Sequence, residues 1–168
     1  MTTIIAVETP TGVEIACDSQ ATGGDKIQME QSKVFHNNGA LYGVAGLALL
    51  ANELCHADLP KPPTDDTTDR WVTRELIPAL RGICETINLK RDDDGEYEMQ
   101  LIVVANRRVY EIQGNCGWVR NSTGVYAIGS GTAFALGALS AGATVSEALE
   151  IAAKHDPYTG YKLSIQSV

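Results

Sequence analysis

Apolar and polar residues alternate through the first quarter of the chain, and a period of two is typical of half-buried β-strands. The alternation predicts strands over residues 2–8, 13–17, 27–35 and 40–45. Turn-forming residues separate these segments, notably at 9–12 (Thr-Pro-Thr-Gly) and 37–39 (Asn-Asn-Gly). Short connections favour antiparallel pairing, so this part of the sequence predicts a meander with short hairpins.

The apolar spacing then changes to three and four residues, which predicts helices over residues 47–57 and 69–90. Pro78 lies inside the second helix, and we expect it to kink the helix or to mark its true start, because proline has no backbone N–H. Residues 58–68 form a linker that is too short to separate domains.

Strands return over residues 97–105, 108–113 and 125–128, followed by helices over 132–141 and from Thr144 to near Lys154, and by a strand over 161–168. Thr144 and Glu147 have the spacing of a capping box at a helix start. Strands and helices are segregated along the chain, which predicts an α+β fold. A four-layer αββα sandwich, two stacked antiparallel sheets with a helix pair outside each, accommodates this order in a single domain of residues 1–168.

Composition excludes several classes of function. The net charge is −8 over 168 residues, so there is no basic stripe for nucleic acid or for an anionic membrane surface. No apolar run approaches the roughly 18–20 residues that span a bilayer, and no secretory signal opens the chain. The four cysteines are widely spaced, which is typical of reduced core residues and not of a zinc cluster, and we expect a cytoplasmic protein.

Thr2 follows Met1 at the start of the first strand. Removal of Met1 would leave a hydroxyl and a free α-amine on one residue, that is, a nucleophile and a base. The α-amine has an ordinary pKa of about 7.7–8.0, so a useful fraction is neutral at pH 7. No added cofactor is required for this chemistry.

Five segments of the chain resemble the proteasome-type N-terminal nucleophile (Ntn) hydrolases, most closely the HslV peptidase subunit and the proteasome beta subunits. The similarity covers nearly the whole chain and lies in Thr2-Thr3-Ile4-Ile5, Cys17-Asp18-Ser19-Gln20-Ala21-Thr22, Val44-Ala45-Gly46, Ala127-Ile128-Gly129-Ser130-Gly131 and Asp156-Pro157-Tyr158-Thr159-Gly160. The resemblance implies a threonine peptidase with Thr2 as its nucleophile.

The resemblance also implies a role for each matching residue. Lys33 would stand beside the Thr2 hydroxyl, Asp18 would keep Lys33 charged, and the N–H of Gly46 would stabilise the oxyanion. A polar group that orients the amine would consist of Ser130, Asp156 and Thr159. In the HslV branch a monovalent cation binds backbone carbonyls, which implies a Na⁺ or K⁺ site at Ala153, Asp156 and Thr159.

The family further implies a homo-oligomeric ring that degrades unfolded polypeptide or peptides, together with an ATP-dependent unfoldase as partner. One departure concerns the specificity pocket, because Leu47, Leu49 and Leu50 stand where the family has small residues.

Other interpretations compete with these. Taken singly, Asp18 could be a turn carboxylate and Lys33 a solvated lysine. Residues 129–131 (Gly-Ser-Gly) imitate a dinucleotide fingerprint, but Phe134 replaces the required small residue. While Met1 is attached, Thr2 cannot react, so a catalytically silent assembly subunit is the alternative function. An Ntn hydrolase of small amides is the third.

Overall fold

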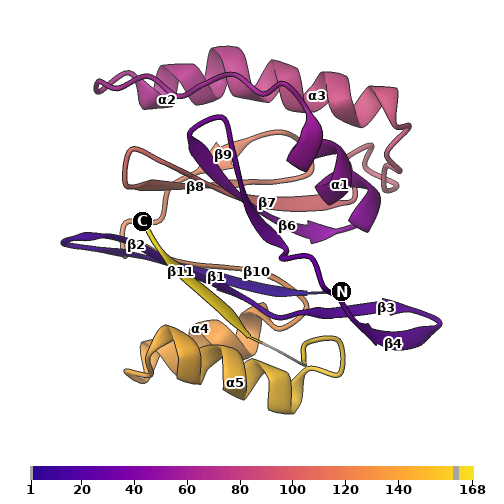
Figure 1. Cartoon of the computed structure of the whole chain (residues 1–168), viewed down its shortest axis with the longest axis vertical. Helices are drawn as coiled ribbons and strands as arrows, with labels where there is room; N and C mark the ends of the chain where they lie inside the picture. The colour runs from indigo at the N-terminus through magenta and orange to yellow at the C-terminus, as the bar shows by residue number, and fades with distance from the viewer. Residues whose placement is uncertain (1, 161–162) are drawn as a thin grey trace.

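The computed structural model describes residues 2–160 and 163–168 of the chain. Two antiparallel sheets stack face to face, and helices cover the outer face of each (Figure 1). One sheet has the strand order β10-β1-β2-β11, and the other has the order β5-β6-β7-β8-β9. The predicted four-layer αββα sandwich is therefore confirmed, whereas the extent of a single domain over 1–168 stays a prediction.

The first sheet consists of β1 (Thr3–Thr9), β2 (Gly12–Cys17), β10 (Val125–Gly129) and β11 (Ser164–Ser167). Helices α4 (Thr132–Ser140) and α5 (Val145–His155) cover it. The second sheet consists of β5 (Val34–Asn37), β6 (Ala40–Gly46), β7 (Met99–Ala105), β8 (Arg108–Ile112) and β9 (Trp118–Val119). Over it lie α1 (Ala48–His56), α2 (Thr68–Trp71), the π-helical segment η1 (Val72–Leu76) and α3 (Ile77–Thr86). Strands β3 (Gln20–Gly23) and β4 (Asp25–Gln28) form a separate hairpin.

Strand β1 is buried on both faces, because it lies between the second sheet and the α4–α5 layer. Its even positions Ile4 and Ala6 face the other sheet, while Ile5 packs against the helices. Fully burying one of these isoleucine side chains contributes about 1.5–3 kcal/mol to folding. This packing fixes the first strand and, with it, the position of Thr2.

Two sequence predictions about elements are wrong. Residues 29–33 form a loop, so the strand expected over 27–35 is two strands, β4 and β5, separated by that loop. The helix expected over 69–90 ends at Thr86, and Asn88 has a positive φ of 49° that ends the helical path. Strand β9 was not predicted, because two residues are too few to show a period.

Pro78 does not mark the start of the helix: a π-helical segment lies directly before it, and Leu76 and Ile77 keep α-helical backbone angles, so the helical path from Thr68 continues through Pro78. Other element predictions are confirmed. Thr144 and Glu147 form the expected capping box of α5. The final strand covers Ser164–Ser167, while residues 161 and 162, which the prediction included, lie outside the described residues.

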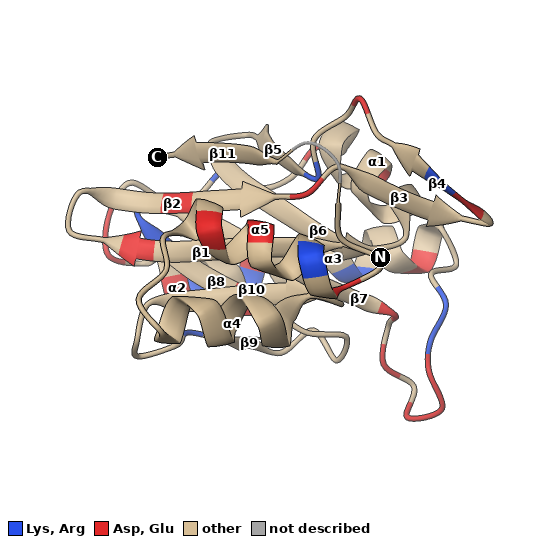
Figure 2. Cartoon of the chain, turned by 90° about the horizontal axis from the view of Figure 1, so that it is seen from below, with Lys and Arg blue, Asp and Glu red and all other residues tan. Residues whose placement is uncertain are grey.

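Basic residues are spread over separate elements, and acidic residues occupy several loops between them (Figure 2). No helix of residues 2–160 and 163–168 has both the length and the apolar character to cross a membrane. Within the same residues, no three His, Cys, Asp or Glu side chains are grouped so that they could hold a metal ion.

Candidate active site

The Asp18 carboxylate joins four segments of the chain. It lies directly after β2 and is 1% exposed. Its Oδ1 accepts hydrogen bonds from Lys33 Nζ at 2.8 Å and from the Thr3 backbone N–H at 2.9 Å. Its Oδ2 accepts from the backbone N–H groups of Gln20 at 2.9 Å and Gly160 at 3.2 Å. Four donors satisfy the capacity of an ionised carboxylate, so its charge is stabilised although it is buried.

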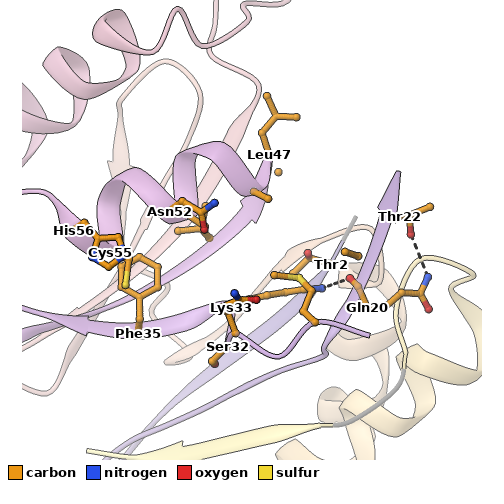
Figure 3. A pocket seen from close by; sticks show the side chains of 17 residues that line it. Thr2, Gln20, Thr22, Ser32, Lys33, Phe35, Leu47, Asn52, Cys55 and His56 are labelled. Carbon is orange, nitrogen blue, oxygen red and sulfur yellow. Dashed lines mark hydrogen bonds between the residues drawn. The ribbon is translucent and has the colours of Figure 1, made fainter. Parts of the chain in front are cut away.

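Lys33 is buried beside the start of the chain, and its ammonium group donates two hydrogen bonds. Its Nζ donates to Asp18 and to the Gln20 carbonyl oxygen at 2.6 Å. Burial lowers the pKa of the Lys33 ammonium, and the Asp18 charge offsets part of this effect. Figure 3 shows the Lys33 side chain extending to Thr2, and both residues line one cavity. A cation with its own counter-charge therefore lies at the residue that is predicted to react.

Ser130, Asp156 and Thr159 also lie together, on the α4–α5 side of Thr2. The Ser130 backbone N–H donates to the Thr2 carbonyl oxygen at 2.9 Å, and its hydroxyl donates to Asp156 Oδ2 at 2.6 Å. The Thr159 hydroxyl donates to the same Oδ2 at 2.6 Å. Burial alone would raise the pKa of Asp156, but these hydrogen bonds outweigh it and hold the pKa below its ordinary value.

Two glycines let this group approach the start of the chain. A Cβ on Gly129 would lie 1.9 Å from the Thr2 carbonyl oxygen, and a Cβ on Gly131 would lie 2.1 Å from the Thr3 hydroxyl oxygen. Neither separation is compatible with a side chain at the glycine. The two glycines of the Gly-Ser-Gly sequence therefore let its backbone lie close to Thr2 and Thr3. This close approach explains the glycines without a dinucleotide-binding role.

Gly46 ends β6 between two cavities. Its φ of 135° lies in the region that favours glycine. One cavity has a volume of about 400 Å³ and the other of about 440 Å³, and both are lined by Thr2 and Gly46. Thr2 therefore has open space on both sides.

The residues of the predicted cation site are compatible with a monovalent ion. Ala153 lies in the last turn of α5, where residue 157 would normally donate to its carbonyl oxygen. That residue is Pro157, which has no N–H, so the Ala153 carbonyl keeps acceptor capacity at the negative end of the helix. The Asp156 carbonyl accepts from the Thr159 N–H at 3.2 Å. Cation binding through Ala153, Asp156 and Thr159 stays a prediction.

The other six residues predicted to be catalytic thus lie around Thr2, and the catalytic roles of all seven stay predictions. Two further residues were missed. Gln20 supplies the carbonyl that Lys33 contacts, and its side chain donates to the Pro157 carbonyl at 2.9 Å. Thr3 contacts both Asp18 and Thr159. Their proximity to the family motifs was a signal, but a backbone carbonyl and a strand threonine are common features in any sequence.

The hydrogen bonds to Asp156 predict a pH-dependent stability. Because its pKa lies below the ordinary 3.8, the ionised carboxylate stabilises the fold above that pH, and this stabilisation is lost as the pH falls through the lowered pKa. Asp156→Asn should therefore lower the free energy of unfolding at pH 7, and the difference from the parent should shrink as the pH falls below about 4. Urea unfolding at a series of pH values measures this, with Asp93→Asn, on an exposed turn, as the control. A difference that stays constant with pH would contradict the assignment.

Comparison with known proteins agrees with this architecture. No family model and no curated protein sequence matches the chain. Among solved structures, BPH of Thiobacillus denitrificans is similar with a TM-score of 0.84 and 22% identity, covering 99% of this chain and 97% of that one. The structure of the same protein in complex with epoxomicin is similar with a TM-score of 0.80 and 21% identity, covering 99% of this chain and 98% of that one. Eukaryotic HslV from Trypanosoma brucei is similar with a TM-score of 0.68 and 23% identity, covering 98% of each chain. The chain therefore has the proteasome-type fold of HslV and the proteasome beta subunits.

Proposed function

We propose that this protein is a threonine peptidase whose nucleophile, Thr2, is exposed by removal of Met1. The observation that carries the proposal is the Asp18 Oδ1 atom, which accepts from both Lys33 Nζ and the Thr3 N–H. This arrangement holds a buried ammonium at the residue that would bear both the hydroxyl and the amine. Catalytic nucleophiles are activated by such a charge and by an adjacent base.

The reaction follows from these positions. The Thr2 amine takes the hydroxyl proton while Oγ1 attacks the peptide carbonyl carbon, and the Gly46 N–H stabilises the oxyanion that forms. The amine then gives its proton to the departing nitrogen, which leaves an ester between Thr2 and the acyl half of the substrate. Water attacks this ester with the same amine as base, so the acid is released and Thr2 is regenerated.

The cavity on the Lys33 side would select the substrate side chain. Its apolar lining includes Met29, Phe35, Val44, Leu47 and Ala51, and Lys33 is the only Lys, Arg, Asp or Glu among the lining residues that the structure describes. The other cavity is lined by Asp92, Glu96 and Glu98. Leu47, which departs from the family, thus extends the apolar wall of the first cavity. We propose that this cavity takes large apolar side chains.

The resemblance supports further parts of the proposal. We propose a cytoplasmic homo-oligomeric ring that takes peptides or unfolded polypeptide and works with an ATP-dependent unfoldase, and that holds a Na⁺ or K⁺ ion structurally. HslV is among the proteins that share the fold. Native mass spectrometry would count the subunits, and a monomer at micromolar concentration would contradict the ring.

Thr2→Ala should lower the rate of peptide cleavage by about 10³-fold or more, because it removes the attacking oxygen. Fluorogenic peptides measure the rate, intact-mass spectrometry confirms loss of Met1, and Thr86→Ala on the exposed surface of α3 is the control. Epoxomicin should inhibit the processed parent protein.

Undiminished cleavage by Thr2→Ala would overturn the mechanism, whereas a full-length mass with no cleavage would favour the assembly subunit. Cleavage of small amides alone would favour the third function.

Ala51→Leu should reduce the preference for large apolar residues, because added methylene groups occupy the cavity that Ala51 lines. The ratio of kcat/KM for a peptide with phenylalanine before the scissile bond to that for one with alanine should fall about tenfold or more. Leu49→Ala, on the exposed side of the same helix, is the matched control and should leave the ratio unchanged. An unchanged ratio in Ala51→Leu would exclude this cavity as the selecting pocket.

A further inference from the structure

Thr3 directly follows the proposed nucleophile, and all of its polar groups are engaged although it is fully buried. Its N–H donates to Asp18 Oδ1 at 2.9 Å, and its carbonyl oxygen accepts from the Asp18 N–H at 3.2 Å. Its hydroxyl oxygen lies 2.5 Å from the Thr159 hydroxyl oxygen. Thr3 is thus bonded both to the Lys33 side of the site, through Asp18, and to the Asp156 side, through Thr159.

The direction of the hydroxyl contact follows from the number of hydrogens. Thr159 has one hydroxyl hydrogen and donates it to Asp156 Oδ2 at 2.6 Å. The bond between the two threonines must therefore run from Thr3 to Thr159. Thr3 therefore donates to Thr159, Thr159 donates to Asp156 Oδ2, and Ser130 donates to the same Oδ2 at 2.6 Å.

The same residues also hold the peptide bond between Thr2 and Thr3. Ser130 fixes the carbonyl oxygen of that bond and Asp18 fixes its N–H, so both ends of the peptide group are held. The available space is just as tight, because a Cβ at position 131 would lie 2.1 Å from the Thr3 hydroxyl oxygen. A displacement of about 1 Å at a reacting group can cost about 10²-fold in rate, so such restraint has a catalytic consequence.

We propose that Thr3 is a positioning residue for the Thr2 nucleophile. Its hydroxyl orients Thr159 and Asp156 around the Thr2 amine, and its N–H ties the same peptide to the Asp18–Lys33 pair. This inference rests on the proposed peptidase function. The competing explanation is that Thr3 is only a β-branched residue suited to a buried strand, a position that valine would fill equally well.

The experiment compares Thr3→Val with Thr3→Ser in protein shown by mass spectrometry to begin at Thr2. Valine keeps the shape and removes the hydroxyl, whereas serine keeps the hydroxyl. Thr3→Val should lower kcat about tenfold or more with KM changed less than twofold, and Thr3→Ser should restore most of the rate. The acid limb of the kcat/KM profile reports the pKa of the Thr2 amine, which is the base of the proposed mechanism. A looser contact between this amine and the Asp156 anion should lower the pKa of the amine, so the limb should move to lower pH in Thr3→Val.

Thr68→Val is the matched control, because Thr68 is another fully buried threonine that accepts a hydrogen bond, from Asn106, on the distant α2. It should alter stability and leave kcat and the pH profile unchanged. If Thr3→Val does not fold, Thr3→Ala against Thr3→Ser makes the same comparison, since the two differ only by the hydroxyl.

Equal kcat and equal pH profiles in the parent and Thr3→Val would overturn the positioning role, as would a serine variant no better than the valine or alanine one. If the parent protein itself cleaves no peptide, the proposed function fails first. The two failures are therefore distinguishable.

Discussion

The carboxylate of Asp18 is the constraint on which the whole site depends. A buried carboxylate is tolerated only when its acceptor sites are filled, and here they are filled by one side chain and three backbone N–H groups. These donors come from the starts of β1 and β3, the loop before β5 and the loop after α5. The electrostatic requirement of one side chain therefore brings the chain's start, the lysine and the 156–160 loop to a single point.

The remaining architecture makes this point rigid. Strand β1 is held between β10 and β2 and is buried on both faces, so Thr2 projects from a fixed strand end. The close contacts at Gly129 and Gly131 bring the α4–α5 side against the same peptide. Beside it, the end of β6 leaves a cavity on each side of Thr2. A site of this kind needs the supporting contacts as much as the reacting group.

Local patterns in the sequence predicted the sandwich, whereas the seven site residues were predicted from the resemblance to a known family. Alternation identified β1 and β2, the capping box identified the start of α5, and the motifs shared with the Ntn hydrolases marked Asp18, Gly46 and Asp156. Other features depend on tertiary contact and carry no local period. The π-helical turn at Val72–Leu76, the break between β4 and β5 and the two-residue β9 are of this kind. So are the roles of Thr3 and Gln20, since one acts through hydrogen-bond geometry and the other through a backbone carbonyl.

The most direct test of the central claim is peptide cleavage by Lys33→Met in protein that begins at Thr2. Methionine retains an apolar side chain of similar length and removes the charge, while Asp18 keeps its three backbone donors, so the fold should survive. We expect a folded variant, verified by circular dichroism and thermal unfolding, that cleaves no peptide. A folded Lys33→Met protein that cleaves at the parent's rate would contradict the claim that this buried cation activates Thr2.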